Sequence, residues 1–262
     1  MMSSEFFTTW FLPGIWVTVQ VTVYAAALGA AIAFGIGLAR GSRHWIVRFV
    51  AGIYFEVFRG MSALVLMFWM FFALPLLGWQ LVPMWAGVSA LGLTYGAYGS
   101  EVVRGSLAAV TPAQKEAGIA LNFTRLQRLR LIELPQAWPE MVPPFNNLLI
   151  ELLKGTALVS VITVADMTFA GNLLRLGTNE TTPVYTLLLV LYFVLAFLIT
   201  RGMRLLERRA KAGIGQRPEK SGGITRKPTA RGESPVAGSQ SQSQSQSQSQ
   251  SQSQSQSAGG TA

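Results

Sequence analysis

The sequence predicts an all-α membrane protein with about five transmembrane helices, and three observations lead to this fold class. Half of the 262 residues are hydrophobic and only 13% are charged, whereas about 25% of a typical soluble domain is charged. Residues 11–39 contain no charged side chain, and a spanning helix needs about 20 mostly apolar residues. Basic residues are concentrated between alternate apolar stretches, which is typical of a chain that crosses a bilayer repeatedly.

Five apolar stretches are candidate spans: residues 11–39, 60–77, 82–100, 142–164 and 183–200. Only the fourth contains charged residues. We expect residues 1–10 to be an external N-terminal segment and residues 11–212 to form the transmembrane domain. Residues 213–262 should be a disordered, low-complexity cytoplasmic tail, because a Ser-Gln alternation offers no apolar surface to bury. The first span is rich in small residues that favour close helix contact, namely Ala25, Gly29, Ala31, Gly35 and Gly37.

The positions of lysine and arginine predict the orientation. All but two of the 21 lie between the first and second spans, between the third and fourth, or after the fifth. Short loops rich in lysine and arginine are cytoplasmic, so the N-terminus should be outside and the C-terminus inside. The formal charge of +9 then reflects topology, and we expect no nucleic-acid partner. The orientation implies a multi-pass protein of a prokaryotic plasma membrane.

The residue inventory excludes several kinds of chemistry. The chain has no cysteine and a single histidine, His44, which excludes disulfides and thiolate metal sites and leaves no histidine cluster for catalysis. No G-x-x-x-x-G-K-[ST] sequence occurs, so the chain has no P-loop for ATP. We therefore expect no catalytic residue, metal or cofactor on this chain.

The segment between the third and fourth spans, residues 104–141, predicts a helix, a sharp turn and a second helix. Residues 111–114, T-P-A-Q, supply an N-cap, a proline at the first helical position and a capping-box partner. Asn122, which tolerates the left-handed conformation, stands where the first helix should end. A second capping box begins at Thr124, and Pro135 predicts that the second helix ends just before it.

These residues carry a family resemblance. The run Glu116-Ala117-Gly118-Ile119-Ala120-Leu121-Asn122 is followed, nine residues later, by Ile132-Glu133-Leu134-Pro135. This is similar to the EAA signature of ATP-binding-cassette importer permeases, in which E-A-A, three residues and G precede nine residues and I-x-L-P. Gly118 replaces the second alanine, and Asn122 replaces the turn glycine. The resemblance implies that the loop is a cytoplasmic helix-turn-helix coupling loop of the EAA type. It assigns ATPase coupling to Glu116, Ala117, Gly118, Asn122, Ile132, Leu134 and Pro135.

Neighbouring segments resemble the polar amino-acid subfamily of these permeases, and the closest resemblance is to its ectoine/hydroxyectoine permeases. The segments are E-V-F-R-G at residues 56–60, A-Y-G-S-E-V-V-R-G at 97–105 and L-L-K-G-T-A-L at 152–158. The resemblance implies alternating-access transport of ectoine, hydroxyectoine or a similar zwitterionic compatible solute, with a polar amino acid as the alternative. It also implies three partners: a cytoplasmic ATPase dimer that binds ATP and Mg, a second permease subunit, identical or paralogous, and an external solute-binding protein.

Two charged residues in the fourth span are candidates for the substrate path. Glu151 and Lys154 lie three residues apart, so they either pair with each other and hold subunits together or meet the charged groups of a zwitterionic solute. Tyr98 and Trp69 offer aromatic faces to a cationic group, or they serve packing. A carrier acting alone with a coupling ion is an alternative of another class. A membrane-embedded enzyme ranks third, because the reactive side-chain cluster is missing.

Overall fold

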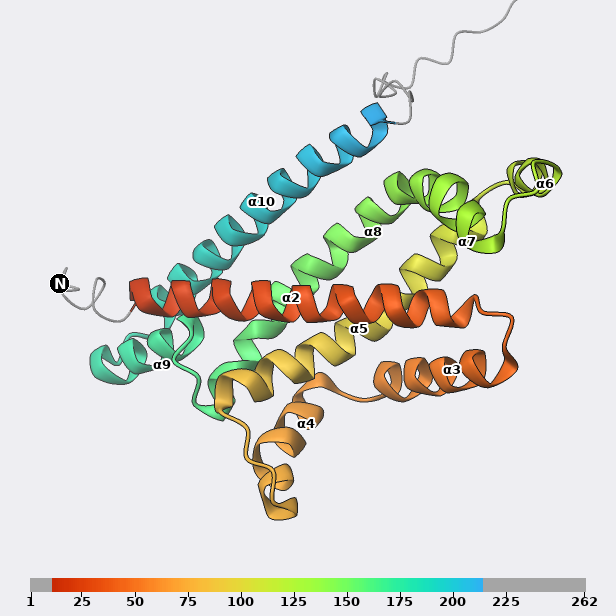
Figure 1. The fold of residues 1–262 in the computed structure, drawn as a ribbon. Coiled ribbons are helices and arrows are strands. Elements are labelled where there is room, and N and C mark those ends of the chain that lie inside the picture. The colour runs from red at the N-terminus through yellow and green to blue at the C-terminus, as the bar shows by residue number, and fades with distance from the viewer. Residues whose placement is uncertain (1–10, 214–262) are drawn as a thin grey trace, which may run out of the picture. The chain divides into compact units, whose positions relative to one another are not determined.

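The computed structural model describes residues 11–213, and this part of the chain contains helices and no strands (Figure 1). This confirms the all-α fold class. The predictions for residues 1–10 and for the tail beyond 213 lie outside the described residues. The α-helices are α2 (Leu12–Arg40), α3 (Trp45–Gly60), α4 (Ala63–Phe68), α5 (Pro83–Ala109), α6 (Pro112–Ala120), α7 (Arg125–Arg128), α8 (Leu134–Gly155), α9 (Met167–Thr178) and α10 (Thr181–Gly213). Short π-helical or 3-10 segments are η2 (Trp69–Ala73), η3 (Leu74–Leu77), η4 (Leu129–Glu133) and η5 (Thr156–Ile162).

Three helical stretches of the described chain are long and apolar enough to cross a membrane: Leu12–Arg40, Arg125–Ile162 and Thr181–Arg209. A fourth results if Trp45–Gly60 and Ala63–Leu77 are counted as one span, although the chain bends by 99° between them. The third predicted span lies within α5, which is less apolar because of its glycines, serines and tyrosines, and which is the helix with the most buried residues. The predicted number of five spans is therefore approximate.

The second predicted span, residues 60–77, is not one straight helix. The chain first forms the amphipathic α3, turns at Met61, and continues through α4, η2 and η3 to Gly78, where a φ of +89° ends the helical segment. Ala63–Leu77 alone is too short to cross about 30 Å of hydrocarbon at about 1.5 Å per residue. The sequence predicts no span over residues 45–60, where Arg48, Glu56 and Arg59 stand among the apolar residues.

The packing of α2 against α5 organises the described helices, and it is the most extensive helix contact among them. Glycine permits the close approach. A Cβ atom added to Gly37 would lie 2.9 Å from the carbonyl oxygen of Ser100 and 2.8 Å from Cβ of Val103. Of the small residues of α2 that were expected to pack closely, Ala25, Gly29 and Gly37 are buried, whereas Ala31 and Gly35 are exposed.

The helix that was predicted to end before Pro135 continues through it. Arg125–Ile162 is one helical stretch of 38 residues, in which α7, η4, α8 and η5 follow one another without a break. A proline in an α-helix lacks a donor and its ring meets the carbonyl four residues earlier. The π-helical turn η4 precedes Pro135, and the Leu134 N–H pairs with the Leu129 carbonyl, five residues back. This wider turn accommodates the proline ring.

Candidate functional site

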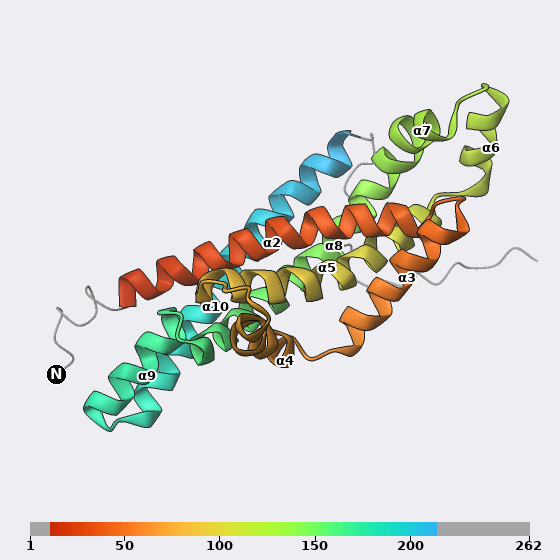
Figure 2. The same ribbon diagram turned by 60° about the horizontal axis from the view of Figure 1, so that its bottom comes forward.

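The predicted coupling loop lies at the end of the described helices where α2 and α5 finish, and α9 lies at the opposite end (Figure 2). Pro112 occupies the first turn of α6, as predicted, but the Thr111 side chain does not cap this helix. The first predicted capping box is therefore wrong. The second is confirmed: the Thr124 N–H donates to Gln127 Oε1 at 2.9 Å, and the Gln127 N–H donates to Thr124 Oγ1 at 3.4 Å.

Asn122 makes the turn between the two helices. Its φ of +57° is left-handed, which confirms that it takes the place of the turn glycine. Its N–H donates to the Ile119 carbonyl at 2.9 Å, and the Phe123 N–H donates to the Gly118 carbonyl at 3.0 Å. These two hydrogen bonds form a Schellman motif, which satisfies carbonyls that the helix end would otherwise leave without partners.

The turn folds α6 back onto η4, and Gly118 is the contact point. Gly118 is buried, and a Cβ atom there would lie 2.8 Å from Ile132 Cδ1 and 3.2 Å from Arg128 Cγ. Arg128 Nε in turn donates to Glu133 Oε1 at 2.8 Å. The structure thus brings two of the predicted coupling residues, Gly118 and Ile132, into contact.

The outer surface of the loop remains open. Glu116, Ala117 and Pro135 are exposed and Leu134 is partly buried. Three large apolar side chains of the same loop are also exposed, by 56% at Ile119, 66% at Leu121 and 70% at Leu126. Apolar side chains gathered on a surface outside the spans are typical of a surface that a partner protein covers.

The candidate substrate path centres on α5 and α8. The Tyr95 hydroxyl donates to the Glu151 carbonyl at 3.0 Å, the Tyr95 and Tyr98 rings lie 6.2 Å apart, and the Tyr98 hydroxyl donates to the Arg59 carbonyl at 3.4 Å. Tyr95 therefore contacts both the backbone of Glu151 on α8 and the ring of Tyr98, one turn along α5.

Glu151 and Lys154 are both exposed, and within the described chain they form no ion pair with each other. Their predicted mutual pairing is therefore not realised in the single chain. Trp69 lies apart on η2, where its side chain is 49% exposed, and the described contacts do not join it to Tyr98 or Glu151.

A three-residue ionic cluster joins α2 and α5. Glu101 pairs with Arg104 one turn along its own helix, and its carboxylate also accepts from Nη1 of Arg40 on α2 at 2.6 Å. The Arg40 guanidinium lies over the Phe55 ring of α3 at 4.0 Å. The spacing of Glu101 and Arg104 predicts their pair, but Arg40 lies 61 residues away in sequence and no local pattern indicates it. Among residues 11–213, no group of three or more His, Asp or Glu residues is suited to a metal ion.

Asp166, which the sequence reading did not single out, anchors the opposite end of α2. It is fully buried, and its carboxylate caps α9 by accepting from the N–H groups of Thr168 at 3.2 Å and Phe169 at 2.9 Å. The N–H of Met167, the residue after Asp166, donates to Thr18 Oγ1 on α2 at 3.1 Å. Asp166 lies outside the spanning stretches, and burial raises the pKa of its carboxyl to about 6, against the opposing effect of the Phe169 and Thr168 N–H donors.

The pKa of Asp166 predicts a pH dependence of stability. The unfolded chain loses this proton near the ordinary value of 3.8 and the native state keeps it up to about pH 6. The free energy of unfolding should therefore fall as the pH rises through this window and level off above it. Asp166→Asn keeps a capping side chain without the charge, so its thermal unfolding in detergent should lose this slope. Equal slopes in the parent chain and the variant would contradict the assignment.

Comparisons with known proteins agree with this arrangement of helices. Residues 31–212 match the family described as the binding-protein-dependent transport system inner membrane component. The chain is 46% identical over 210 residues to a probable amino-acid ABC transporter permease of Sinorhizobium fredii. The matched region covers 78% of this chain and 88% of the relative. It is 32% identical over 202 residues to the glutamine transport system permease of Escherichia coli, and this match covers 76% of this chain and 92% of the relative.

Two solved structures of ABC transporters are similar to this chain. An amino acid ABC transporter with histidines aligns with a TM-score of 0.72 and 32% identity over 78% of this chain and 95% of the other. An inward-facing methionine ABC transporter aligns with a TM-score of 0.69 over 80% of this chain and 99% of the other, and at 20% identity it shows the fold alone.

These findings settle the class of the protein. The relatives are transporter permeases and not enzymes, which confirms that expectation and argues against a carrier that works alone. A permease of an ABC importer implies an ATPase partner and a solute-binding protein. The chain therefore belongs to the family of binding-protein-dependent inner-membrane components, as a multi-pass ABC transporter permease of the polar amino-acid type.

Proposed function

We propose that this chain is the membrane subunit of an importer for a polar amino acid, which it moves by alternating access while a separate ATPase dimer supplies the energy. The relatives that carry a substrate name support an amino acid, since one is a glutamine permease and one structure is an amino acid transporter with histidines. The ectoine-type compatible solute suggested by the resemblance has no such support and stays a prediction. In this proposal the N-terminus is outside, and a second permease subunit completes the path.

The exposed face that carries Glu151 and Lys154 is the observation on which the substrate path rests. A charged side chain facing lipid costs about 2.5–3.5 kcal/mol on the insertion scale, and these two are exposed without pairing with each other. Lipid is therefore an unfavourable neighbour for this face. A water-filled path between two permease subunits solvates both charges, and the ammonium and carboxylate match the opposite charges of a zwitterionic amino acid.

The coupling loop supports the ATPase part of the proposal. Its turn is held by the Schellman motif at Asn122, and its exposed apolar residues include Leu121. A rigid element joined directly to a spanning helix transmits a rigid-body movement rather than absorbing it. We assign ATPase contact to the exposed Glu116 and Ala117, and the support of the loop to Gly118, Asn122 and Ile132, with Leu134 and Pro135 at the start of α8.

Replacing Lys154 with methionine tests the substrate path. The complete transporter, with its ATPase and solute-binding protein, should assemble normally in proteoliposomes but lose at least about tenfold in ATP-driven uptake, which corresponds to about 1.4 kcal/mol. Glu140→Gln is the matched control, since Glu140 is an exposed charge of the same helix α8 outside the proposed path. Loss of co-purification with the ATPase in Lys154→Met would instead indicate that the residue holds subunits together, which contradicts the proposal.

The same proteoliposomes identify the solute. Labelled glutamine and histidine should enter only with ATP and with the binding protein present, and an excess of unlabelled ectoine should leave this uptake unchanged. If ectoine alone is imported, the compatible-solute prediction replaces the amino-acid proposal. Uptake without ATP would contradict both.

A further inference from the structure

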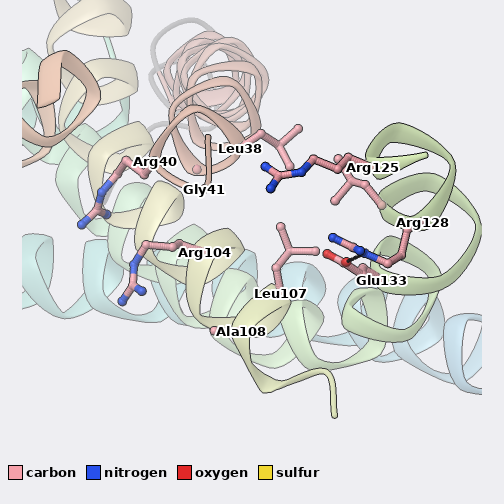
Figure 3. Close-up of a pocket in the computed structure, with 11 residues that line it drawn as sticks. Leu38, Arg40, Gly41, Arg104, Leu107, Ala108, Arg125, Arg128 and Glu133 are labelled. Carbon is pink, nitrogen blue, oxygen red and sulfur yellow. Dashed lines mark hydrogen bonds and ion pairs between the residues drawn. The ribbon is translucent and has the colours of Figure 1, made fainter. Parts of the chain in front are cut away.

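A basic cavity of about 370 Å³ lies where three separate parts of the chain meet. One wall is the C-terminal end of α2, the second is the C-terminal end of α5, and the third is the start of the long helical stretch at α7 and η4 (Figure 3). The lining side chains that carry charge are Arg40, Arg104, Arg125, Arg128 and Glu133. The cavity is lined by none of the substrate-path candidates and by neither Glu116 nor Ala117, to which ATPase contact is assigned.

The charges around the cavity are not balanced. Glu101 pairs with both Arg40 and Arg104, and Glu133 pairs with Arg128. The Arg125 side chain takes part in no ion pair or hydrogen bond among the described residues. Four guanidinium groups therefore face two carboxylates, which leaves two positive charges at the cavity without compensation.

The guanidinium groups are placed so that an anion can reach them. Arg125 extends toward Leu38, and Arg128 lies beside Glu133 and points toward Leu107, so both border the cavity from its α7 side (Figure 3). Arg128 pairs with Glu133 through Nε, so its two terminal nitrogens keep donors for another acceptor. Guanidinium forks match the oxygens of a phosphate group in geometry and charge, and such charge-assisted hydrogen bonds are stronger than neutral ones.

We propose that this cavity binds a phosphate group, with Arg125 and Arg128 as the principal donors. The cavity adjoins the ends of two long helices on the basic side of the protein, so the phosphate belongs either to the headgroup of an acidic phospholipid or to a soluble phosphate ion. A phosphate here connects α7 to the ends of α2 and α5. It therefore stabilises the position of the coupling loop against the helices.

The test uses the full permease, in complex with its ATPase, in nanodiscs. One arm compares phosphatidylglycerol with phosphatidylcholine, and the other adds inorganic phosphate to phosphatidylcholine nanodiscs at constant ionic strength. The readout is the thermal unfolding temperature. Because Arg125 makes no structural ion pair, Arg125→Gln should fold normally, and Arg130→Gln is the matched control, an exposed arginine of the same stretch that does not line the cavity.

We expect one of the two phosphate sources to raise the unfolding temperature of the parent complex, because a ligand that binds only the native state stabilises it. Arg125→Gln should lose roughly half or more of that increase, and Arg130→Gln should keep it. An increase with phosphatidylglycerol alone identifies the lipid headgroup, and an increase with inorganic phosphate identifies the soluble ion. If neither source has an effect, or if both variants lose the increase equally, the proposal is wrong.

Discussion

Gly37→Leu is expected to reduce the amount of stably folded protein severalfold or more. A side chain at Gly37 meets the backbone carbonyl of Ser100 at 2.9 Å, and backbone cannot move aside as a flexible side chain can. Leucine there must push α2 away from α5 along their whole contact. Overpacking typically costs about 1–3 kcal/mol and more where backbone must shift, so we expect at least a severalfold loss of folded protein.

Gly35→Leu is the control for this prediction. Gly35 lies two residues away on the same helix, and an added Cβ there meets nothing within 4 Å. The yield of monodisperse protein in size-exclusion chromatography and the thermal unfolding temperature in detergent measure both variants. Similar behaviour of the two would show that the α2–α5 approach at Gly37 is not needed for the fold.

Gly118→Leu is expected to uncouple ATP hydrolysis from transport. Leucine at this position needs the space that Ile132 and Arg128 occupy, so α6 must tilt away from η4. In the proposed function α6 passes the movement of the ATPase to the long helix, and we expect uptake to fall by about tenfold or more, equivalent to about 1.4 kcal/mol. Uptake and ATP hydrolysis, measured in the same proteoliposomes, separate a coupling defect from a dead ATPase.

Two further variants serve as controls for Gly118→Leu. Gly118→Ala restores the alanine of the EAA signature and meets mainly the mobile end of Ile132, while it gains up to about 1 kcal/mol of helix propensity. It should therefore keep most of the uptake. Gly105→Leu adds the same side chain at the end of α5, where nothing lies within 4 Å. If Gly118→Leu transports as well as these two, the contact between α6 and η4 does not carry the coupling.

Local patterns in the sequence predict local features of this protein well. The apolar residues of α2, the proline that starts α6, the capping box at Thr124 and the left-handed Asn122 each depend on interactions within a few residues. Such interactions can be recognised from spacing alone. The pair between Glu101 and Arg104 belongs to the same class, since one helical turn separates its members.

Features that depend on the surroundings could not be predicted in this way. Pro135 reads as a helix end, yet the π-helical turn before it allows the helix to continue. No span is predicted over α3, because charged residues stand among its apolar ones. In the structure these charges lie on one face of an amphipathic helix. For the candidate site, the sequence identifies Tyr98 and Glu151 but not that Tyr95 contacts both of them. It also leaves the cavity at Arg125 unseen, because its walls come from segments far apart in the chain.

The uninterrupted stretch from Arg125 to Ile162 has a mechanical consequence. Its 38 residues extend over roughly 55 Å at about 1.5 Å per residue, with Arg125 at one end and Lys154 near the other. The turn η4 and the internal prolines Pro139, Pro143 and Pro144 lie between them, and these are the points at which the helix can bend. In the proposed function, a movement of the coupling loop reaches Lys154 through these points, so the displacement at the substrate path depends on how stiff the helix is at η4 and at its prolines.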